Sequence, residues 1–178
     1  SRSAETWCEA LRDALAIVDE HLPVIRSEID LVVHQFIPVG YDAERHVSAS
    51  YAEAVGTIYL SLHPSSMTMV EAVIHEHQHN KLNALLELDP LIENAFWPLF
   101  ASPVRPDPRP LHGILLAVHA FLAVEALYRR RIEAGHEGLT RRYDEIVRGN
   151  REGAAVLLEH AVPTPMGAAL LDEIRRLS

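Results

Sequence analysis

The chain has a single cysteine, Cys8, and this scarcity excludes several kinds of protein. One thiol cannot form an intramolecular disulfide, and it cannot supply the thiolates of a cysteine-based zinc or iron–sulfur site. A cytoplasmic protein is the natural expectation, because reducing compartments do without disulfides. With 178 residues, one domain can bury a sizeable core without such cross-links, so we expect a single domain over residues 1–178.

Basic runs and long apolar runs are also scarce. The formal net charge is −9, from 16 Lys and Arg against 25 Asp and Glu, and no basic run is longer than Arg129–Arg131. Nucleic acid is therefore a poor candidate partner. The longest apolar stretch, near residues 114–127, is interrupted by His119 and Glu125, so we expect no membrane span. The chain also has no glycine-rich phosphate loop, no G-x-S-x-G motif, no internal repeat and no secretory signal.

Histidine, by contrast, is abundant, and the stretch from His75 to His79 contains the pattern H-E-x-x-H. On a helix predicted over residues 64–88, His75 and His79 leave the same face about one turn apart, as two metal ligands would. Glu76 is rotated by about 100° to the edge of that face, where it can reach a metal-bound water. His77 is turned about 200° away and is expected to face outward or to pack elsewhere. The alternative is a histidine-rich surface helix without a metal.

The rest of the chain predicts an α+β fold that is mostly helical. Apolar residues at helical spacing predict helices at residues 4–21, 111–134, 138–158 and 165–177. Runs rich in β-branched residues predict strands at residues 29–39, 46–50 and 56–62, and a short helix is expected within residues 89–100. Strands directly before an H-E-x-x-H helix follow the zincin order. We therefore expect a zincin-like domain whose small β-sheet precedes that helix.

Two histidines leave most of a metal's coordination shell unfilled, and the third ligand is sought on the predicted helix 111–134. His112 and His119 lie seven residues apart on this helix, close to two turns, so they share a face. Only one of them can join the H-E-x-x-H pair, because about 10 Å of axial rise separates them. We favour His119, which lies deeper in the apolar run, and keep His112 and Glu125 as alternatives.

Four prolines alternate with polar residues in the segment 101–110, which predicts an irregular backbone. A passive connector and a functional loop are equally compatible with this pattern. The stiff segment carries Arg105 and Arg109, and guanidinium groups bind carboxylates through paired hydrogen bonds. Such arginines suit an iron(II) site, whose free positions accept a 2-oxo acid and dioxygen. A zinc site that activates water, with Glu76 as general base, has no need of them.

Three separated motifs agree in order with one known family. They are His75-Glu76-x-x-His79 with Lys81-Leu82 behind it, Ser102-Pro103-x-Arg105-x-Asp107-Pro108-Arg109-Pro110-Leu111-x-Gly113, and Ala120-Phe121-Leu122-Ala123-Val124. From about residue 47 to residue 128, the chain resembles the HExxH-motif family of peptide-modification proteins, which is associated with ribosomally synthesised, post-translationally modified peptides (RiPPs).

The resemblance implies a zincin-like scaffold turned to oxidation. It implies an iron(II)- and 2-oxoglutarate-dependent dioxygenase that hydroxylates the β-carbon of a residue in a precursor peptide. His75 and His79 would be iron ligands by this resemblance, and His119 is our choice for the third. Arg105 or Arg109 would hold 2-oxoglutarate, an assignment that rests on the chemistry of the residues.

The sequence also bears on how the substrate is bound and on which other functions are possible. No segment resembles a separate leader-peptide-binding domain, so we expect the precursor peptide to lie in a shallow groove or to be presented by a partner protein. The chain starts at Ser1 without methionine, so residues upstream are expected to be missing. One alternative is a zinc metallopeptidase or amidase with Glu76 as general base, and Zn(II) can also replace iron at imidazole ligands. The other is a non-catalytic binding subunit that a metal stabilises.

Overall fold

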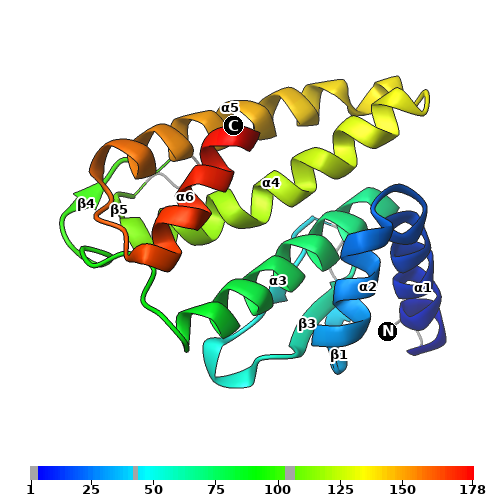
Figure 1. Ribbon diagram of the computed structural model, residues 1–178. Helices are drawn as coiled ribbons and strands as arrows, with labels where there is room; N and C mark the ends of the chain where they lie inside the picture. The colour runs from blue at the N-terminus through cyan, green and yellow to red at the C-terminus, as the bar shows by residue number, and fades with distance from the viewer. Residues whose placement is uncertain (1–3, 42–43, 103–106) are drawn as a thin grey trace. The chain divides into compact units, whose positions relative to one another are not determined.

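The computed structural model describes residues 4–41, 44–102 and 107–178. Their contacts divide the chain into two compact units, Ser1–Asn83 and Ala84–Ser178, which are described separately. The described residues are mostly helical and include a small mixed sheet, so the α+β expectation is confirmed (Figure 1). The single domain over residues 1–178 stays a prediction, since two compact units can belong to one domain.

The first unit holds the three-stranded sheet and the H-E-x-x-H helix. Its elements in order are α1 (Ala4–His21), α2 (Pro23–Val32), β1 (Gln35–Tyr41), β2 (Ser48–Ala49), the short 3₁₀ helix η1 (Ala52–Ala54), β3 (Thr57–Leu62) and α3 (Ser66–Leu86). Strand β3 is central, with β1 parallel on one side and β2 antiparallel on the other. The sheet precedes α3 in the sequence, as predicted.

Buried side chains explain why β3 is the centre of this unit. Ile58 and Leu60 of β3 are fully buried. The indole nitrogen of Trp7, on α1, donates a hydrogen bond of 2.9 Å to the carbonyl of Leu60 and fixes α1 against the strand. On the α3 side, the Asn80 side-chain oxygen accepts a 2.6 Å hydrogen bond from the amide of Gly56, directly before β3. The sheet therefore positions the central turns of α3.

The predicted strand 29–39 is wrong in its first part. Residues up to Val32 belong to α2, and β1 begins only at Gln35. Pro23 occupies the start of α2, where proline is preorganised for a helix, and Ile29 is buried on the inner face of that helix. At its other end β1 continues past Pro38, which was expected to turn the chain. Proline is tolerated there because β1 is an edge strand.

The second unit is a helical hairpin with a third helix packed on it. Its elements are β4 (Leu99–Phe100), β5 (Arg109–Pro110), α4 (Leu111–Glu133), the 3₁₀ helix η2 (Glu137–Leu139), α5 (Thr140–His160) and α6 (Pro165–Leu177). Helices α4 and α5 lie side by side and α6 contacts both (Figure 1). The three predicted helices are confirmed. The short helix expected within residues 89–100 is wrong, because β4 and an isolated bridge of Ile92 to Pro163 occur there.

The start of α6 is docked tightly on the segment after α3. The Thr164 hydroxyl accepts a 3.0 Å hydrogen bond from the amide of Gly167 and donates one of 2.6 Å to Asp89. The Thr164 amide donates to the carbonyl of Leu91 at 3.0 Å. A Cβ at Gly167 would lie 2.7 Å from the carbonyl carbon of Leu91 and nearer still to its oxygen. Only glycine fits this approach.

Helix α4 is more apolar than the sequence analysis expected. An 18-residue window of it has a mean hydropathy of 1.7, so by length and composition α4 is able to cross a membrane, despite His119 and Glu125. Half of this window is buried inside the structure. Core helices of soluble proteins meet the same criterion, so α4 is weak evidence for a membrane.

Candidate metal site

The H-E-x-x-H pair lies on the middle turns of α3. The rings of His75 and His79 face each other edge to face, with centroids 4.3 Å apart and an interplanar angle of 80°. Side chains four residues apart on an α-helix lie on the same face, about one turn from each other. The sequence therefore predicts that the two rings lie close together. The two imidazoles are close enough to bind one metal ion.

Burial keeps both imidazoles in the form that a metal needs. It lowers the pKa of His75 to about 3, with a further contribution from the charge of His79, and it lowers the pKa of His79 to about 4. Both rings are therefore neutral at pH 7, and each has a lone pair to donate. The buried Nδ1 of His79 has no hydrogen-bond partner among the described residues. Coordination is one way to satisfy such a nitrogen, so the pair fits two positions of an iron or zinc site.

Glu76 is held on the sheet side of α3 by two serines. Its side chain is buried, and the hydroxyl groups of Ser48 and Ser50 donate to its two carboxylate oxygens, at 2.8 Å and 2.6 Å respectively. Burial raises the pKa of Glu76, and the hydrogen bonds from Ser50 and Ser48 oppose that rise. Each carboxylate oxygen thus already accepts one hydrogen bond. This serine clamp (Ser48 and Ser50) fixes the carboxylate one residue after His75, the first candidate metal ligand.

The serine clamp was missed by sequence reasoning, although a signal for it exists. Residues two apart in an extended segment point to the same side; Ser48 lies on β2, and Ser50 directly follows the end of that strand. A Glu expected inside the protein also requires hydrogen-bond donors. Asn80 was missed as well. Its side-chain nitrogen donates to the backbone carbonyl of Glu76 at 3.0 Å, next to its bond with Gly56.

His77, between the two candidate ligands, packs on α2 and away from them. Its side chain is fully buried, and its Nε2 lies 3.4 Å from a carboxylate oxygen of Glu28. Lys81 donates to both oxygens of the same carboxylate at 2.9 Å. Burial alone would raise the pKa of Glu28, but the hydrogen bonds and charges of Lys81 and then His77 together outweigh it and lower that pKa. This group joins α2 to α3 and leaves His77 engaged in packing.

The candidates for the third ligand all lie on α4, in the second unit. His119 is half-buried there. The ring of His112 packs against that of Phe96 at 5.1 Å, and burial lowers its pKa. Glu125 accepts a hydrogen bond of 2.8 Å from the amide nitrogen of Asn150. Among the described residues of the first unit, no third His, Cys, Asp or Glu joins the α3 pair in a metal-holding group. His119 as third ligand stays a prediction.

Of the two candidate arginines, Arg109 lies among the described residues and Arg105 does not. Arg109 opens β5, opposite Phe100 of β4, and its Nε lies 2.9 Å from a carboxylate oxygen of Asp107. The Arg109 side chain is 40% exposed, so a ligand carboxylate can compete with Asp107 for it. Arg105 lies outside the described residues. Strands β4 and β5 pair antiparallel, Leu99 with Pro110 and Phe100 with Arg109, and whether the segment between them is a functional loop stays open.

Comparisons with known proteins add no assignment: no protein-family model matches the chain, and no curated protein matches it. The likeness to the HExxH-motif family therefore remains an interpretation of the three motifs.

Proposed function

We propose that the protein is an iron(II)- and 2-oxoglutarate-dependent oxygenase of the cytoplasm. Its substrate would be a ribosomally synthesised precursor peptide, hydroxylated at a side-chain β-carbon. The observation that supports the proposal most is the pair of neutral, adjoining imidazoles at His75 and His79, beside a carboxylate whose two oxygens are both held by hydroxyl groups. A carboxylate fixed in this way is better suited to orient groups beside a metal than to move as a hydrolytic base.

The roles of the residues follow from this proposal. His75 and His79 hold the iron, with His119 as the third ligand. Iron(II), when bound, would supply activation of dioxygen, which is the oxidant; one of its oxygen atoms would enter the C–H bond, and the other would oxidise 2-oxoglutarate to succinate and carbon dioxide. Arg109 binds the distal carboxylate of 2-oxoglutarate in exchange for Asp107, or Arg105 does so. Glu76 stays in its serine clamp and maintains the orientation of the ligand helix.

The second candidate is a zinc metallopeptidase or amidase, and one observation favours it. Burial raises the pKa of Glu76, which brings this carboxylate closer to the range in which a general base works best at neutral pH. Under this proposal the same histidines hold zinc, and Arg109 of β5 has no part in the reaction. The third candidate is a non-catalytic binding subunit that the metal stabilises.

An anaerobic titration separates these candidates. The iron(II)-loaded protein is titrated with 2-oxoglutarate, and the visible charge-transfer band of a chelated 2-oxo acid is followed. Arg105→Ala and Arg109→Ala are compared with Arg151→Ala, an exposed arginine of α5. We expect the band to form and one of the first two variants, but not the third, to lose it.

Other results of these experiments would support one of the alternative functions. No band, in a protein that binds metal through His75 and His79, rejects the oxygenase. Peptide cleavage that is lost in Glu76→Gln while zinc stays bound would then establish the hydrolase. A rise in thermal stability on metal binding, without turnover of any peptide or of 2-oxoglutarate, would support the binding subunit.

A further inference from the structure

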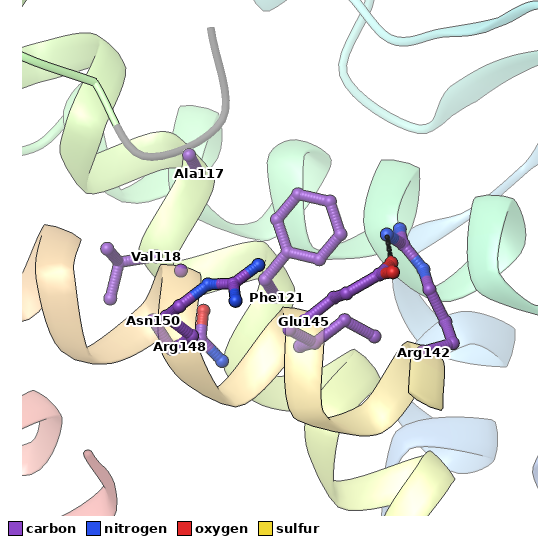
Figure 2. A pocket seen from close by; sticks show the side chains of 9 residues that line it. Ala117, Val118, Phe121, Arg142, Glu145, Arg148 and Asn150 are labelled. Carbon is purple, nitrogen blue, oxygen red and sulfur yellow. Dashed lines mark ion pairs between the residues drawn. The ribbon is translucent and has the colours of Figure 1, made fainter. Parts of the chain in front are cut away.

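A cavity of about 330 Å³ lies between α4 and α5, entirely within the second unit (Figure 2). Ala117, Val118 and Phe121 form its wall on α4, and Ile146 contributes from α5. The volume is within the range of small-molecule sites, which are mostly apolar with a few polar groups at their edge. None of these residues belongs to the candidate metal site.

The polar groups of this cavity include one arginine, Arg148, that has no carboxylate partner among the described residues. Arg142, Glu145 and Arg148, all on α5, line it. The carboxylate of Glu145 already has two partners, Arg142 at 3.5 Å and Arg141 at 3.3 Å, so it is not available to Arg148. The guanidinium of Arg148 extends toward Phe121 (Figure 2). Among the described residues, no carboxylate pairs with Arg148. Arg148 is exposed, so a negatively charged group bound in the cavity would meet its guanidinium without competition from a protein carboxylate.

We propose that this cavity binds a small organic carboxylate with an apolar body. The carboxylate pairs with the guanidinium of Arg148, and the apolar body lies against Phe121, Val118 and Ile146. Burial of the apolar body supplies affinity, and the planar guanidinium supplies selectivity for a carboxylate over a neutral group of the same shape. The proposal does not rest on the metal or on the proposed oxygenase activity.

Gly149 provides a way to fill the cavity without disturbing the helix backbone. It lines the cavity, and a Cβ added there would meet no atom within 4 Å. Glycine inside a helix is unfavourable relative to residues with a side chain, so a larger residue is tolerated by the backbone of α5. Gly149→Leu should therefore place a side chain in the ligand's space and leave the protein folded.

The test is calorimetric titration of the metal-free full chain with 3-phenylpropionate, 4-phenylbutyrate and octanoate. We expect saturable binding of at least one of them. The neutral amide of the carboxylate that binds should bind at least about tenfold more weakly. Arg148→Gln should cause a similar loss, whereas Arg151→Gln, an exposed arginine of the same helix outside the cavity, should leave affinity unchanged. Gly149→Leu should abolish binding at an unchanged or higher melting temperature.

Two results would overturn the proposal. One is the absence of binding by all three carboxylates to the folded protein. The other is binding that persists in both Arg148→Gln and Gly149→Leu, which would place the ligand elsewhere on the surface. Because the experiment uses metal-free protein and no 2-oxo acid, neither result bears on the oxygenase proposal, and failure of the oxygenase proposal leaves this site standing.

Discussion

At the scale of single residues, the serine clamp determines how Glu76 is held. Ser50→Ala removes the 2.6 Å hydrogen bond to a buried carboxylate. A hydrogen bond to a charged group contributes about 1.5–3 kcal/mol, so we expect the free energy of unfolding at pH 7 to fall by about that amount in urea denaturation. Ser27→Ala, on the exposed side of α2, should change it by less than about 0.5 kcal/mol. Equal effects of the two variants would contradict the clamp.

The burial of the histidines leads to a second prediction, which concerns how the stability of the metal-free protein depends on pH. Burial lowers the pKa of His79 from 6.5 to about 4, so between these pH values the unfolded chain binds a proton that the folded chain does not. Stability from this group is therefore present above pH 6.5 and lost as the pH falls toward 4, at up to about 1.4 kcal/mol per pH unit.

To test this pH dependence, the parent protein is compared with His79→Gln and with His136→Gln, which replaces an exposed histidine. Free energies of unfolding are measured in urea from pH 4 to pH 7 after metal removal. We expect the slope in this range to decrease in His79→Gln and to match the parent in His136→Gln. Identical slopes in all three proteins would show that His79 is not buried in its neutral form.

The same residues show what could be read from the sequence. His75 and His79 are four apart on one helix, so the geometry of that helix alone brings their rings together. Ser48 is separated from Glu76 by 28 residues, and Glu28 from His77 by 49. Such contacts depend on how a strand or helix docks against α3, which no local periodicity specifies.

At the scale of elements, long periodic segments were predicted and short ones were not. Helices α1, α4, α5 and α6 were expected within a few residues of their ends, because each repeats an apolar stripe over several turns. Residues 29–32 were assigned to a strand because β-branched residues favour strands, but burial of Ile29 on a helix that starts at Pro23 outweighs that preference. Tertiary packing decides such short segments.

A third prediction concerns the docking of α6. Gly167→Ala places a methyl group against the backbone of Leu91, which cannot move aside as a flexible side chain would. We expect the free energy of unfolding to fall by about 3 kcal/mol or more. Gly138→Ala, where a Cβ meets nothing within 4 Å, should change stability by less than about 1 kcal/mol. Urea denaturation of both variants checks this, and a mild Gly167→Ala would mean that α6 docks less closely.

At the scale of the whole molecule, the question is whether the proposed metal site takes ligands from one unit or from both. His75 and His79 belong to the first unit, and the predicted third ligand belongs to the second. If the first unit alone bound the metal, variants of α4 would leave metal affinity unchanged. If His119 completes the site, its loss removes one of three protein ligands. Metal affinity is therefore a measure of whether α4 contributes to the site.

The fourth prediction is that His119→Ala weakens Zn(II) binding by about a hundredfold or more, since loss of a neighbouring hydrogen-bond partner alone typically costs 10–100-fold. Competition against a chromophoric chelator measures it. His112→Ala and Glu125→Gln, on the same helix, should each change affinity by less than about threefold, while His75→Ala should abolish specific binding. Because bound metal itself raises the melting temperature, the folding of the variants is compared at equal metal occupancy. If metal affinity fell in His112→Ala or Glu125→Gln and not in His119→Ala, the third ligand would be assigned to that residue of α4. If metal affinity fell in none of the three variants, the metal ligands would all be assigned to the first unit.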